Sequence, residues 1–326
     1  MNKKTLKKIS QPIEQALEDF SSHFNDAMKS DVFLVDMVAK YILKQKGKRV
    51  RPLLVLLSSE MCGGVNERSM RGATLVELLH TATLVHDDVV DSSEKRRGLP
   101  SINAVWKNKI AVLMGDYLLS KGLMQAVNED DFDFLKIITD TVRRMSEGEL
   151  LQIGKTRKLD IDEPTYFRII SDKTASLLST CCEIGARAST DDEEKIVAMR
   201  KFGENLGMAF QIRDDILDYV GKTNIIGKPL GGDIKEKKIT LPLIFAMSKA
   251  KNGEVEKIKK LIKKSRKSGK VQEIFDFVNK YDGIKYADNL AVEFAEKAVE
   301  NIRMFEESEV KEALSGLVDF VIKRIK

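Results

Sequence analysis

Residues 72–98 read GATLVELLHTATLVHDDVVDSSEKRRG, and this stretch decides how the rest of the chain can fold. Its apolar residues Leu75, Leu78, Leu79 and Val85 recur at helical spacing, and no proline interrupts them. This periodicity predicts a helix that is buried over most of its length. We therefore take it as the element around which the rest of the chain is arranged.

Three aspartates end the predicted helix, and two arginines follow them. Asp87 and Asp91 are four residues apart, so both side chains point to one side of the helix, with Asp88 beside them. Carboxylates are costly to bury unless positive charge neutralises them, and Arg96 and Arg97 come next in the chain. Oxygen ligands on one face suit Mg²⁺, which completes its shell with water and substrate phosphate. The stretch predicts a magnesium–phosphate site at the end of a core helix.

The composition is that of a globular protein with a large core. Of the 326 residues, 43% are hydrophobic and 32% are charged, and nothing forces a division, so we expect one domain over residues 1–326. The net charge of +5 comes without a basic stripe interleaved with aromatics, so no nucleic-acid partner is expected. No uninterrupted apolar run of about 18 residues predicts a transmembrane segment. Cys62, Cys181 and Cys182 lack metal-ligand spacing and suit a reducing compartment, so we expect a cytoplasmic protein.

Helical periodicity dominates the chain, and strand signals are almost absent. The sequence therefore predicts an all-α, single-domain bundle of about a dozen helices. The longest helices are expected at residues 110–127, 130–154, 164–188 and 193–219. Residues 220–238 are rich in Gly and Lys and are expected to form a loop.

The acidic pattern occurs a second time, in residues 211–218, which read QIRDDILD. Asp214 and Asp218 share a helix face as Asp87 and Asp91 do, with Asp215 beside them. Acidic helix ends exposed to water explain one such pattern well but explain the pair poorly. Two facing clusters that hold divalent ions would attract a polyanion such as diphosphate, whose outer oxygens need Lys and Arg.

Several basic and polar residues lie where helices begin or loops turn. His80 is seven residues before Asp87 on the same helix face, so it is either a ligand of this pocket or a hydrogen-bonded core histidine. Gln211 precedes Asp214 by three residues and can reach the same pocket. The basic candidates are Lys48, Arg49, Arg51, Arg96, Arg97, Lys173, Lys228 and Lys238.

The chain resembles the trans-type isoprenyl (polyprenyl) diphosphate synthases, in particular the bacterial members that make hexa- to octaprenyl products. The resemblance runs from about Gly47 to Leu243. The stretches that carry it are GKRVRP (47–52), LLHTATLVHDDVVD (78–91), RRG (96–98), GDYLL (115–119), SDKTASL (171–177), AFQIRDDILD (209–218) and GKPLGGDIKEKKITLP (227–242). Their order and spacing are together highly specific. The resemblance implies the isoprenoid synthase fold, in which the helices surround a central cavity, and a homodimer.

The resemblance also implies a role for each matched residue. Three Mg²⁺ ions would be held against an allylic diphosphate by Asp87, Asp91 and Asp214, with Asp88, Asp215 and Asp218 in support. Arg96, Lys173, Lys228 and Lys238 would contact the same diphosphate. Lys48, Arg51, His80 and Arg97 would form the pocket for isopentenyl diphosphate. Thr174 and Gln211 would lie near the carbon at which positive charge develops, and together with Lys173 they are the expected catalytic residues.

The implied reaction joins isopentenyl diphosphate to an allylic diphosphate. Product length should depend on the side chains below the first acidic motif, namely Ala82, Thr83 and Leu79. In the family, aromatic residues here stop growth at short products, whereas small ones leave room. Ala82 and Thr83 are small, so we expect a polyprenyl diphosphate of about C30–C40.

Other functions remain open at this point. A geranylgeranyl or farnesyl diphosphate synthase would share every motif and differ only in product length. A class I terpene cyclase shares the fold and the first acidic motif, but its second motif normally carries Asn or Asp, Ser or Thr, and Glu. A non-catalytic partner subunit usually loses one acidic motif, whereas this chain keeps both. A helical scaffold with incidental acidic ends would bind no Mg²⁺–diphosphate.

Overall fold

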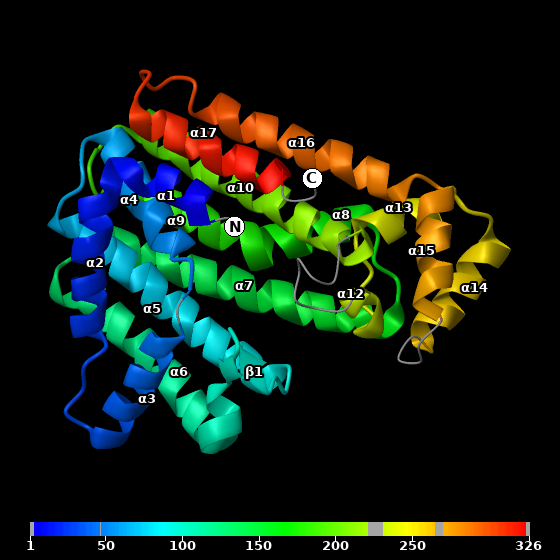
Figure 1. The fold of residues 1–326 in the computed structure, drawn as a ribbon, viewed down its shortest axis with the longest axis horizontal. Coiled ribbons are helices and arrows are strands. Elements are labelled where there is room, and N and C mark those ends of the chain that lie inside the picture. The colour runs from blue at the N-terminus through cyan, green and yellow to red at the C-terminus, as the bar shows by residue number, and fades with distance from the viewer. Residues whose placement is uncertain (1–2, 46, 221–230, 265–269, 324–326) are drawn as a thin grey trace.

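The computed structural model describes residues 3–45, 47–220, 231–264 and 270–323. The described chain is almost entirely helical, so the all-α prediction is confirmed (Figure 1). The first helices are α1 (Lys3–Ser10), α2 (Glu14–Ala27), α3 (Phe33–Lys44), α4 (Val50–Cys62), α5 (Glu67–Val90), α6 (Ile102–Asn128) and α7 (Phe132–Lys158). The later helices are α8 (Glu163–Ile170), α9 (Ser176–Arg187), α10 (Glu193–Val220), α12 (Gly232–Lys235), α13 (Leu241–Lys249), α14 (Asn252–Lys263), α15 (Lys270–Lys280), α16 (Gly283–Asn301) and α17 (Glu309–Ile322). Two short segments complete the set, the 3₁₀ turn η1 (Gln11–Ile13) and the π-helical turn η2 (Ser171–Ala175).

Helix α5 is the buried element that its sequence predicts. The Asn66 side chain accepts a hydrogen bond from the Ser69 backbone N–H, and the Ser69 hydroxyl caps Asn66 in return, so the helix start is fixed. Helices α4, α6 and α9 pack around it, and α10 lies beyond α9. Most α5 side chains are buried, including Leu75, Leu78 and Leu79. The helix thus runs through the core, and its aspartates lie at its C-terminal end.

The core has two parts. The larger cluster contains side chains of α4, α5, α6, α9 and α10. The smaller one contains side chains of α13, α15 and α16, toward the right-hand end of Figure 1. Phe294 and Ile322 pack against both clusters, and α10 contributes to both, so this helix connects the two parts. Both ends of the long helix α10 are therefore anchored.

The structure differs from the sequence prediction in one short hairpin. Strands β1 (Lys95–Arg96) and β2 (Leu99–Pro100) pair antiparallel, where no strand is predicted. Arg97 and Gly98 form the two-residue turn between them, with φ values of 51° and 82°. Positive φ at both positions is the geometry of a type I′ turn, whose twist matches that of paired strands. The hairpin follows directly on the first acidic motif.

A second difference concerns the expected helix over residues 164–188. The structure divides this stretch into α8, the π turn η2 and α9. A π turn inserts one residue into a continuous helical path, so the hydrophobic periodicity hardly registers it. The turn contains Lys173 and Thr174, two of the predicted site residues.

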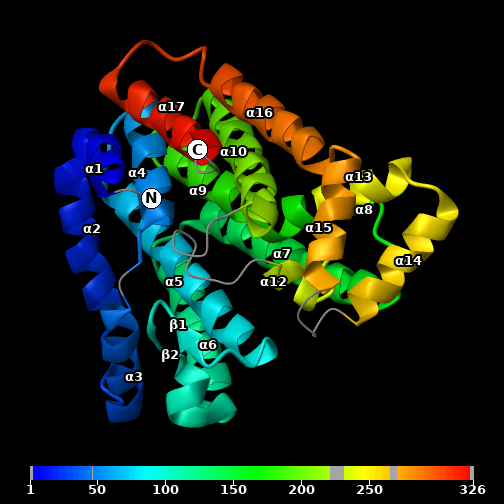
Figure 2. The same cartoon turned by 45° about the vertical axis from the view of Figure 1, so that its right-hand side comes forward.

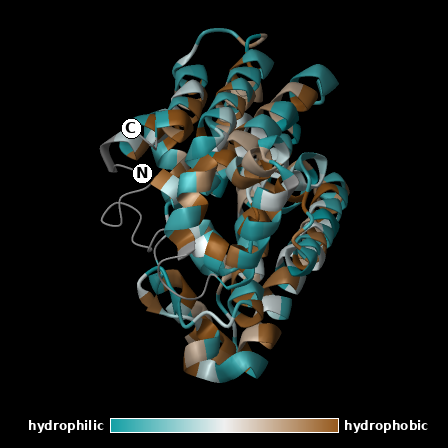
Figure 3. Cartoon of the chain, turned by 90° about the vertical axis from the view of Figure 1, so that its right-hand side faces the viewer, coloured by the Kyte–Doolittle hydropathy of each residue, from teal (hydrophilic) through white to brown (hydrophobic). Residues whose placement is uncertain are grey.

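Helix α6 exposes several large apolar side chains on its outer side. By length and composition alone, α6 could cross a membrane. Of its most apolar 18-residue stretch, 33% is buried inside the protein. One such helix is weak evidence for a membrane span, because core helices pass the same test. Figure 3 shows hydrophobic residues at the lower end of the molecule, where Figure 1 places α3 and α6.

Close packing between α4 and α9 yields a first prediction. A Cβ atom added at Gly185 would lie 2.1 Å from the backbone oxygen of Val55, whereas one added at Gly154 would meet nothing within 4 Å. Gly185→Ala should therefore destabilise the fold by about 1–3 kcal/mol, since a backbone atom cannot move aside cheaply. Gly154→Ala should stabilise it by ~0.5–1 kcal/mol through helix propensity.

Thermal unfolding of the two variants beside the wild type measures both effects. A melting temperature that falls for Gly185→Ala and rises for Gly154→Ala is expected. Equal behaviour of the two variants would contradict the close approach of α4 and α9.

Candidate active site

The three aspartates at the end of α5 have different surroundings. Asp87 and Asp91 are exposed to solvent, whereas Asp88 is only 3% exposed. The buried carboxylate of Asp88 accepts three hydrogen bonds from Arg96, of which the shortest joins Nη2 to Oδ1 at 2.6 Å. Asp88 is therefore neutralised within the protein. Partial burial raises the pKa of Asp87, and the positive charges of Lys173 and Arg96 oppose this shift.

The β1–β2 hairpin holds Arg96 in this position. Figure 2 shows the hairpin beside α5 and α6. The Tyr41 hydroxyl of α3 donates to the Pro100 carbonyl at 2.8 Å, and Asn103 Nδ2 donates to the Ser93 carbonyl at 3.1 Å. The hairpin is thus tied to α3 on one side and to the start of α6 on the other.

The second acidic motif, near the end of α10, repeats this division. Asp214 is exposed, and Asp215 is buried. Asp215 accepts hydrogen bonds from Tyr166 Oη at 2.7 Å and from Gln211 Nε2 at 2.8 Å. Burial, and then the nearby charge of Asp233, raise the pKa of Asp215 to about 8. In both motifs the middle aspartate of the three is buried and hydrogen-bonded to side chains of the protein.

Asp218 fixes the short helix α12 that follows the undescribed segment 221–230. Its two carboxylate oxygens accept backbone N–H groups of Gly232 at 2.9 Å and Asp233 at 3.1 Å, an N-terminal cap. Burial raises the pKa of Asp233 to about 6, and the charge of Asp218 adds to the shift. Asp233 is an acidic member of the site that the sequence analysis missed, although it stands directly after the Gly231–Gly232 pair.

The π turn η2 brings a lysine and a threonine between the two acidic motifs. Lys173 Nζ donates to Gln152 Oε1 of α7 at 2.7 Å and pairs with Glu149 of the same helix. Thr174 Oγ1 donates to Gln211 Oε1 at 2.8 Å. Gln152 and Glu149 were not predicted as site residues, because polar residues on an amphipathic helix such as α7 give no signal of their own.

Electrostatic interactions place the two motifs around one cleft. The positive charge of Lys173 in η2 opposes the burial-induced rise in the pKa of Asp87 in α5. Lys238 donates to Glu236 at 2.7 Å, and the charges of Asp233 and Asp91 help to raise its pKa against the effect of burial. In the described part of the chain, no three acidic, His or Cys side chains converge as a metal site by themselves. Lys173 and Lys238 thus lie near Asp87 and Asp91 of the first motif, and Lys238 also lies near Asp233, which follows the second motif; we call the region that these five residues border the cleft.

A cavity of about 390 Å³ lies next to this cleft. One side is basic, with Lys48, Arg49, Arg51 and Arg97. The opposite side is apolar and is formed by Leu178, Leu206, Phe210, Leu317, Phe320 and Val321. Thr174 also lines the cavity, so the π turn is shared between the cleft and the cavity.

The groups in the cavity are poised for an anion. Arg51 Nε is buried and has no hydrogen-bond partner, and burial lowers the pKa of this guanidinium. A buried donor of this kind is costly unless a ligand satisfies it. His80 is 6% exposed, and burial together with the charges of Arg51 and Arg97 lowers the pKa of His80 well below its usual range. The imidazole is therefore neutral.

Glu77 is an acidic residue of the cavity that the sequence analysis missed. It lies three residues before His80 on the same face of α5, a spacing that would have revealed it. Burial raises the pKa of Glu77, and the charges of Arg51, Arg97 and Arg49 oppose the shift. Glu77 thus offsets part of the positive charge around the cavity.

Arg97 connects the hairpin with the loop before α4. Its Nη1 donates to the Gln45 carbonyl at 2.9 Å. A Cβ atom at Gly47 would lie 2.5 Å from the same nitrogen, so a residue without a side chain lets the guanidinium approach the loop.

The remaining predicted residues lie elsewhere. Lys228 is outside the described residues. Leu79 and Ala82 are each 2% exposed and Thr83 is half-buried, and none of the three belongs to the lining of the 390 Å³ cavity. The structure thus gathers the predicted metal and diphosphate residues around the cleft and the cavity, and it leaves the predicted chain-length residues in the packed interior of α5.

Comparison with known proteins agrees with this arrangement. The model of the Polyprenyl synthetase family matches residues 33–278. The chain is 35% identical over 319 residues to an all-trans-nonaprenyl-diphosphate synthase (geranyl-diphosphate specific) of Rhodobacter capsulatus, covering 98% of both chains. It is 34% identical over 290 residues to a short chain isoprenyl diphosphate synthase of Methanothermobacter thermautotrophicus, covering 88% of this chain and 89% of that protein.

A solved structure shows the same fold. The polyprenyl synthase from Caulobacter crescentus, complexed with calcium and isoprenyl diphosphate, has a TM-score of 0.89 at 33% identity and covers 98% of each chain. The family match, the identity to relatives over nearly the whole length and this structural likeness agree. The chain therefore belongs to the polyprenyl synthetase family of prenyl transferases, the isoprenyl diphosphate synthases.

Proposed function

We propose that the protein condenses isopentenyl diphosphate with an allylic diphosphate in a Mg²⁺-dependent reaction and extends the chain to about C30–C40. The observation that carries the proposal is the pair of adjacent anion sites, an acidic cleft and a basic cavity, that share Thr174. A class I cyclase binds one diphosphate and has no use for the second site. Two sites side by side suit a reaction that joins two diphosphate esters.

The donors in the cleft suit Mg²⁺. Asp87, Asp91 and Asp214 are carboxylates open to solvent, and carboxylate oxygens are the ligands that Mg²⁺ prefers. We assign these three to the metal, three ions being the number that the family resemblance implies, and we assign the hydrogen-bonded Asp88, Asp215 and Asp218 to support. Bound Mg²⁺ would act as a Lewis acid toward the leaving diphosphate. Calcium in the Caulobacter protein supports a divalent cation here.

The basic residues divide between the two substrates. Lys173, Arg96 and Lys238 border the acidic cleft and would hold the allylic diphosphate, as would Lys228. Arg51, Lys48 and Arg97 would hold isopentenyl diphosphate in the cavity, and this ligand would satisfy the buried Nε of Arg51. The neutral His80 would donate a hydrogen bond there without adding charge.

The reaction joins the two substrates at the shared π turn. The C–O bond of the allylic diphosphate breaks, and positive charge develops on the allylic carbon. The oxygens of Thr174 and Gln211, held by their mutual hydrogen bond, would stabilise this charge. The double bond of isopentenyl diphosphate then forms the new C–C bond, and a proton leaves to the departed diphosphate. The apolar wall of the cavity keeps water away from the cation.

Incubation with labelled isopentenyl diphosphate, farnesyl or geranylgeranyl diphosphate and Mg²⁺ tests the proposal. The dephosphorylated products should form a ladder that ends at about C30–C40. EDTA should abolish incorporation, and added Mg²⁺ should restore it. A ladder that ends at C15 or C20 would replace the proposed product with that of a short-chain synthase, a class that the Methanothermobacter relative represents.

A pair of arginine variants shows whether the basic cavity takes part. Arg51→Gln should raise the KM for isopentenyl diphosphate by about 10–100-fold, the effect of losing a charged hydrogen bond of ~1.5–3 kcal/mol. Arg143→Gln, in which an arginine that is 58% exposed on α7 is replaced, is the matched control and should change nothing. If neither variant alters this KM, the cavity is not the isopentenyl site.

Product length is predicted to depend on Ala82, five residues before Asp87. A buried side chain here lies about one turn deeper in α5 than the metal ligands. Ala82→Phe should shorten the main product by at least one isoprene unit, and Ala82→Leu should shorten it less. Chromatography of the products measures the shift, with thermal unfolding as the check on folding. Unchanged product length in a folded Ala82→Phe variant would contradict the role of this position.

We further propose that the protein is a cytoplasmic homodimer in which α6 faces its partner. Val105, Val112, Leu113, Met124 and Val127 of α6 are each at least 40% exposed, a row of large apolar side chains that a second copy would cover. The free cysteines Cys62, Cys181 and Cys182 suit a reducing compartment.

Light scattering after size-exclusion chromatography tests the dimer. The wild type should have twice the mass of the 36.8 kDa chain. The double variant Leu113→Asp, Met124→Asp should be a monomer, because two buried charges would oppose association. Val299→Asp, at a 41% exposed residue of α16, is the control and should remain a dimer. A wild-type protein that elutes as a monomer would overturn the proposal.

A further inference from the structure

The positive charge of the chain is concentrated in one segment. Residues 249–264 contain seven lysines and two glutamates, so their net charge equals the +5 of the whole chain. The other 310 residues are balanced overall. The function proposed above uses none of these lysines.

Helix α14 and its C-terminal end present four of these lysines on one side. Ile258 and Ile262 are buried in the smaller core cluster. The opposite side consists of the exposed residues Lys257, Lys260, Lys263 and Lys264, which we call the basic face of α14. Spacings of three and four residues place Lys257, Lys260 and Lys264 in one row along the helix.

Carboxylates neutralise little of this face. Lys257 lies 3.7 Å from Glu273, and the two side chains are 71% and 51% exposed. An ion pair that is so exposed contributes little, because water screens it. The basic face therefore has positive charge that is available to interact with an anionic partner.

The basic face lies at one end of the molecule. Figures 1 and 2 place α14 and α15 on the side of α12 and α13, away from α1, α2 and α3. The basic face is therefore remote from the amino-terminal helices.

We propose that the basic face of α14 docks the protein onto anionic lipid headgroups at a membrane surface. A cluster of lysines on an amphipathic helix attracts such headgroups. The benefit of docking rests on the proposed function: a diphosphate with about 30–40 apolar carbons is poorly accommodated in water, and docking would release it beside a bilayer. Nucleic acid is the weaker partner, since α14 carries no aromatic side chain on which bases would stack.

Co-sedimentation of the full-length protein with lipid vesicles tests the proposal without substrate, so it can fail independently of the proposed activity. The wild type should sediment with vesicles of phosphatidylcholine and phosphatidylglycerol but not with phosphatidylcholine alone. Binding should fall in high salt, which screens the lysines. The triple variant Lys257→Glu, Lys260→Glu, Lys264→Glu should bind about tenfold or more weakly.

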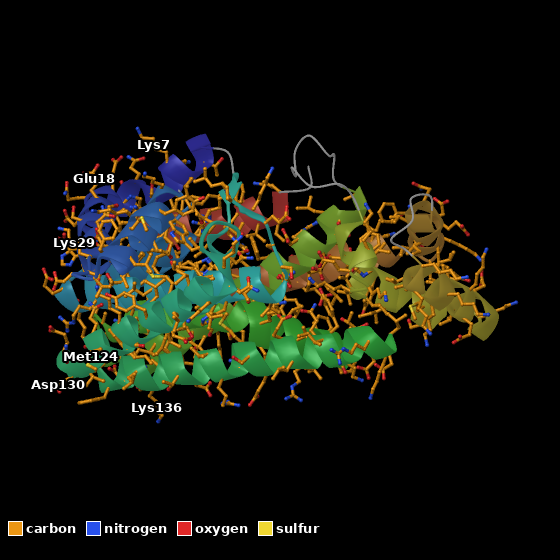
Figure 4. All side chains as sticks on the ribbon, turned by 90° about the horizontal axis from the view of Figure 1, so that it is seen from below. Lys7, Glu18, Lys29, Met124, Asp130 and Lys136 are labelled. Carbon is orange, nitrogen blue, oxygen red and sulfur yellow. The ribbon has the colours of Figure 1, made fainter. Side chains whose placement is uncertain are left out.

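The matched control changes the same charge at the opposite end of the molecule. Lys7, Lys8 and Lys136 are exposed, and Figure 4 shows Lys7 and Lys136 at the end away from α14. Lys7→Glu, Lys8→Glu, Lys136→Glu should keep wild-type vesicle binding. A triple Lys→Gln variant of the basic face, with the same melting temperature as the wild type, guards against misfolding and should also bind weakly.

Each other outcome overturns the proposal. Absence of wild-type binding, equal binding to vesicles without phosphatidylglycerol, or equal loss in both Glu variants would show that α14 is not a lipid-docking face. Displacement of the protein from anionic vesicles by an equal charge concentration of RNA would assign the basic face to nucleic acid instead.

Discussion

The buried ion pair between Asp88 and Arg96 is the interaction on which both anion sites depend. Asp88 lies at the end of the buried helix α5, where its carboxylate would be very costly without a partner. Removing one member of a buried pair typically costs about 3–5 kcal/mol, because the other charge is left uncompensated. The pair fixes the hairpin against α5. Since Arg97 follows Arg96 directly, the same contact sets where Arg97 enters the cavity.

The acidic motifs could be recognised in the sequence because their signals are physical and local. Helical spacing puts Asp87 and Asp91 on one face, and a second copy of the pattern at another helix end made an accidental match improbable. Helical spacing alone could not separate the roles of the aspartates, which only the family resemblance distinguished. Asp88 and Asp215 differ from their neighbours in burial and in their partners Arg96, Tyr166 and Gln211, which lie 4 to 49 residues away in the chain.

Two elements of the site escaped prediction for different reasons. Strands β1 and β2 have two residues each, too few for any alternation to appear, and only Gly98 hints at the turn. The π turn η2 lies inside a helical stretch whose periodicity continues on both sides. Both are local departures from regular geometry, and both carry proposed substrate-binding residues. Departures from regular geometry are expected at functional sites, because ligand binding there can require a backbone conformation that a regular helix or strand does not provide.

The cavity and the cleft differ in the sign of their excess charge, and they therefore differ in whether an anionic ligand needs a metal ion to bind. Around the cavity, the cations Lys48, Arg49, Arg51 and Arg97 face a single carboxylate, Glu77, so an anion is attracted without any added ion. In the cleft, the acidic side chains of both motifs meet basic residues such as Lys173 and Lys238. A polyanion entering the cleft would be repelled by the exposed carboxylates unless divalent cations bound first or with it.

This contrast follows from the side chains themselves. Two hydrogen bonds, from Thr174 to Gln211 and from Gln211 to Asp215, link the cavity to the second acidic motif through partly buried side chains. In the proposed reaction, the metal requirement would therefore be confined to the substrate whose C–O bond breaks, while nitrogen donors alone would hold the other substrate.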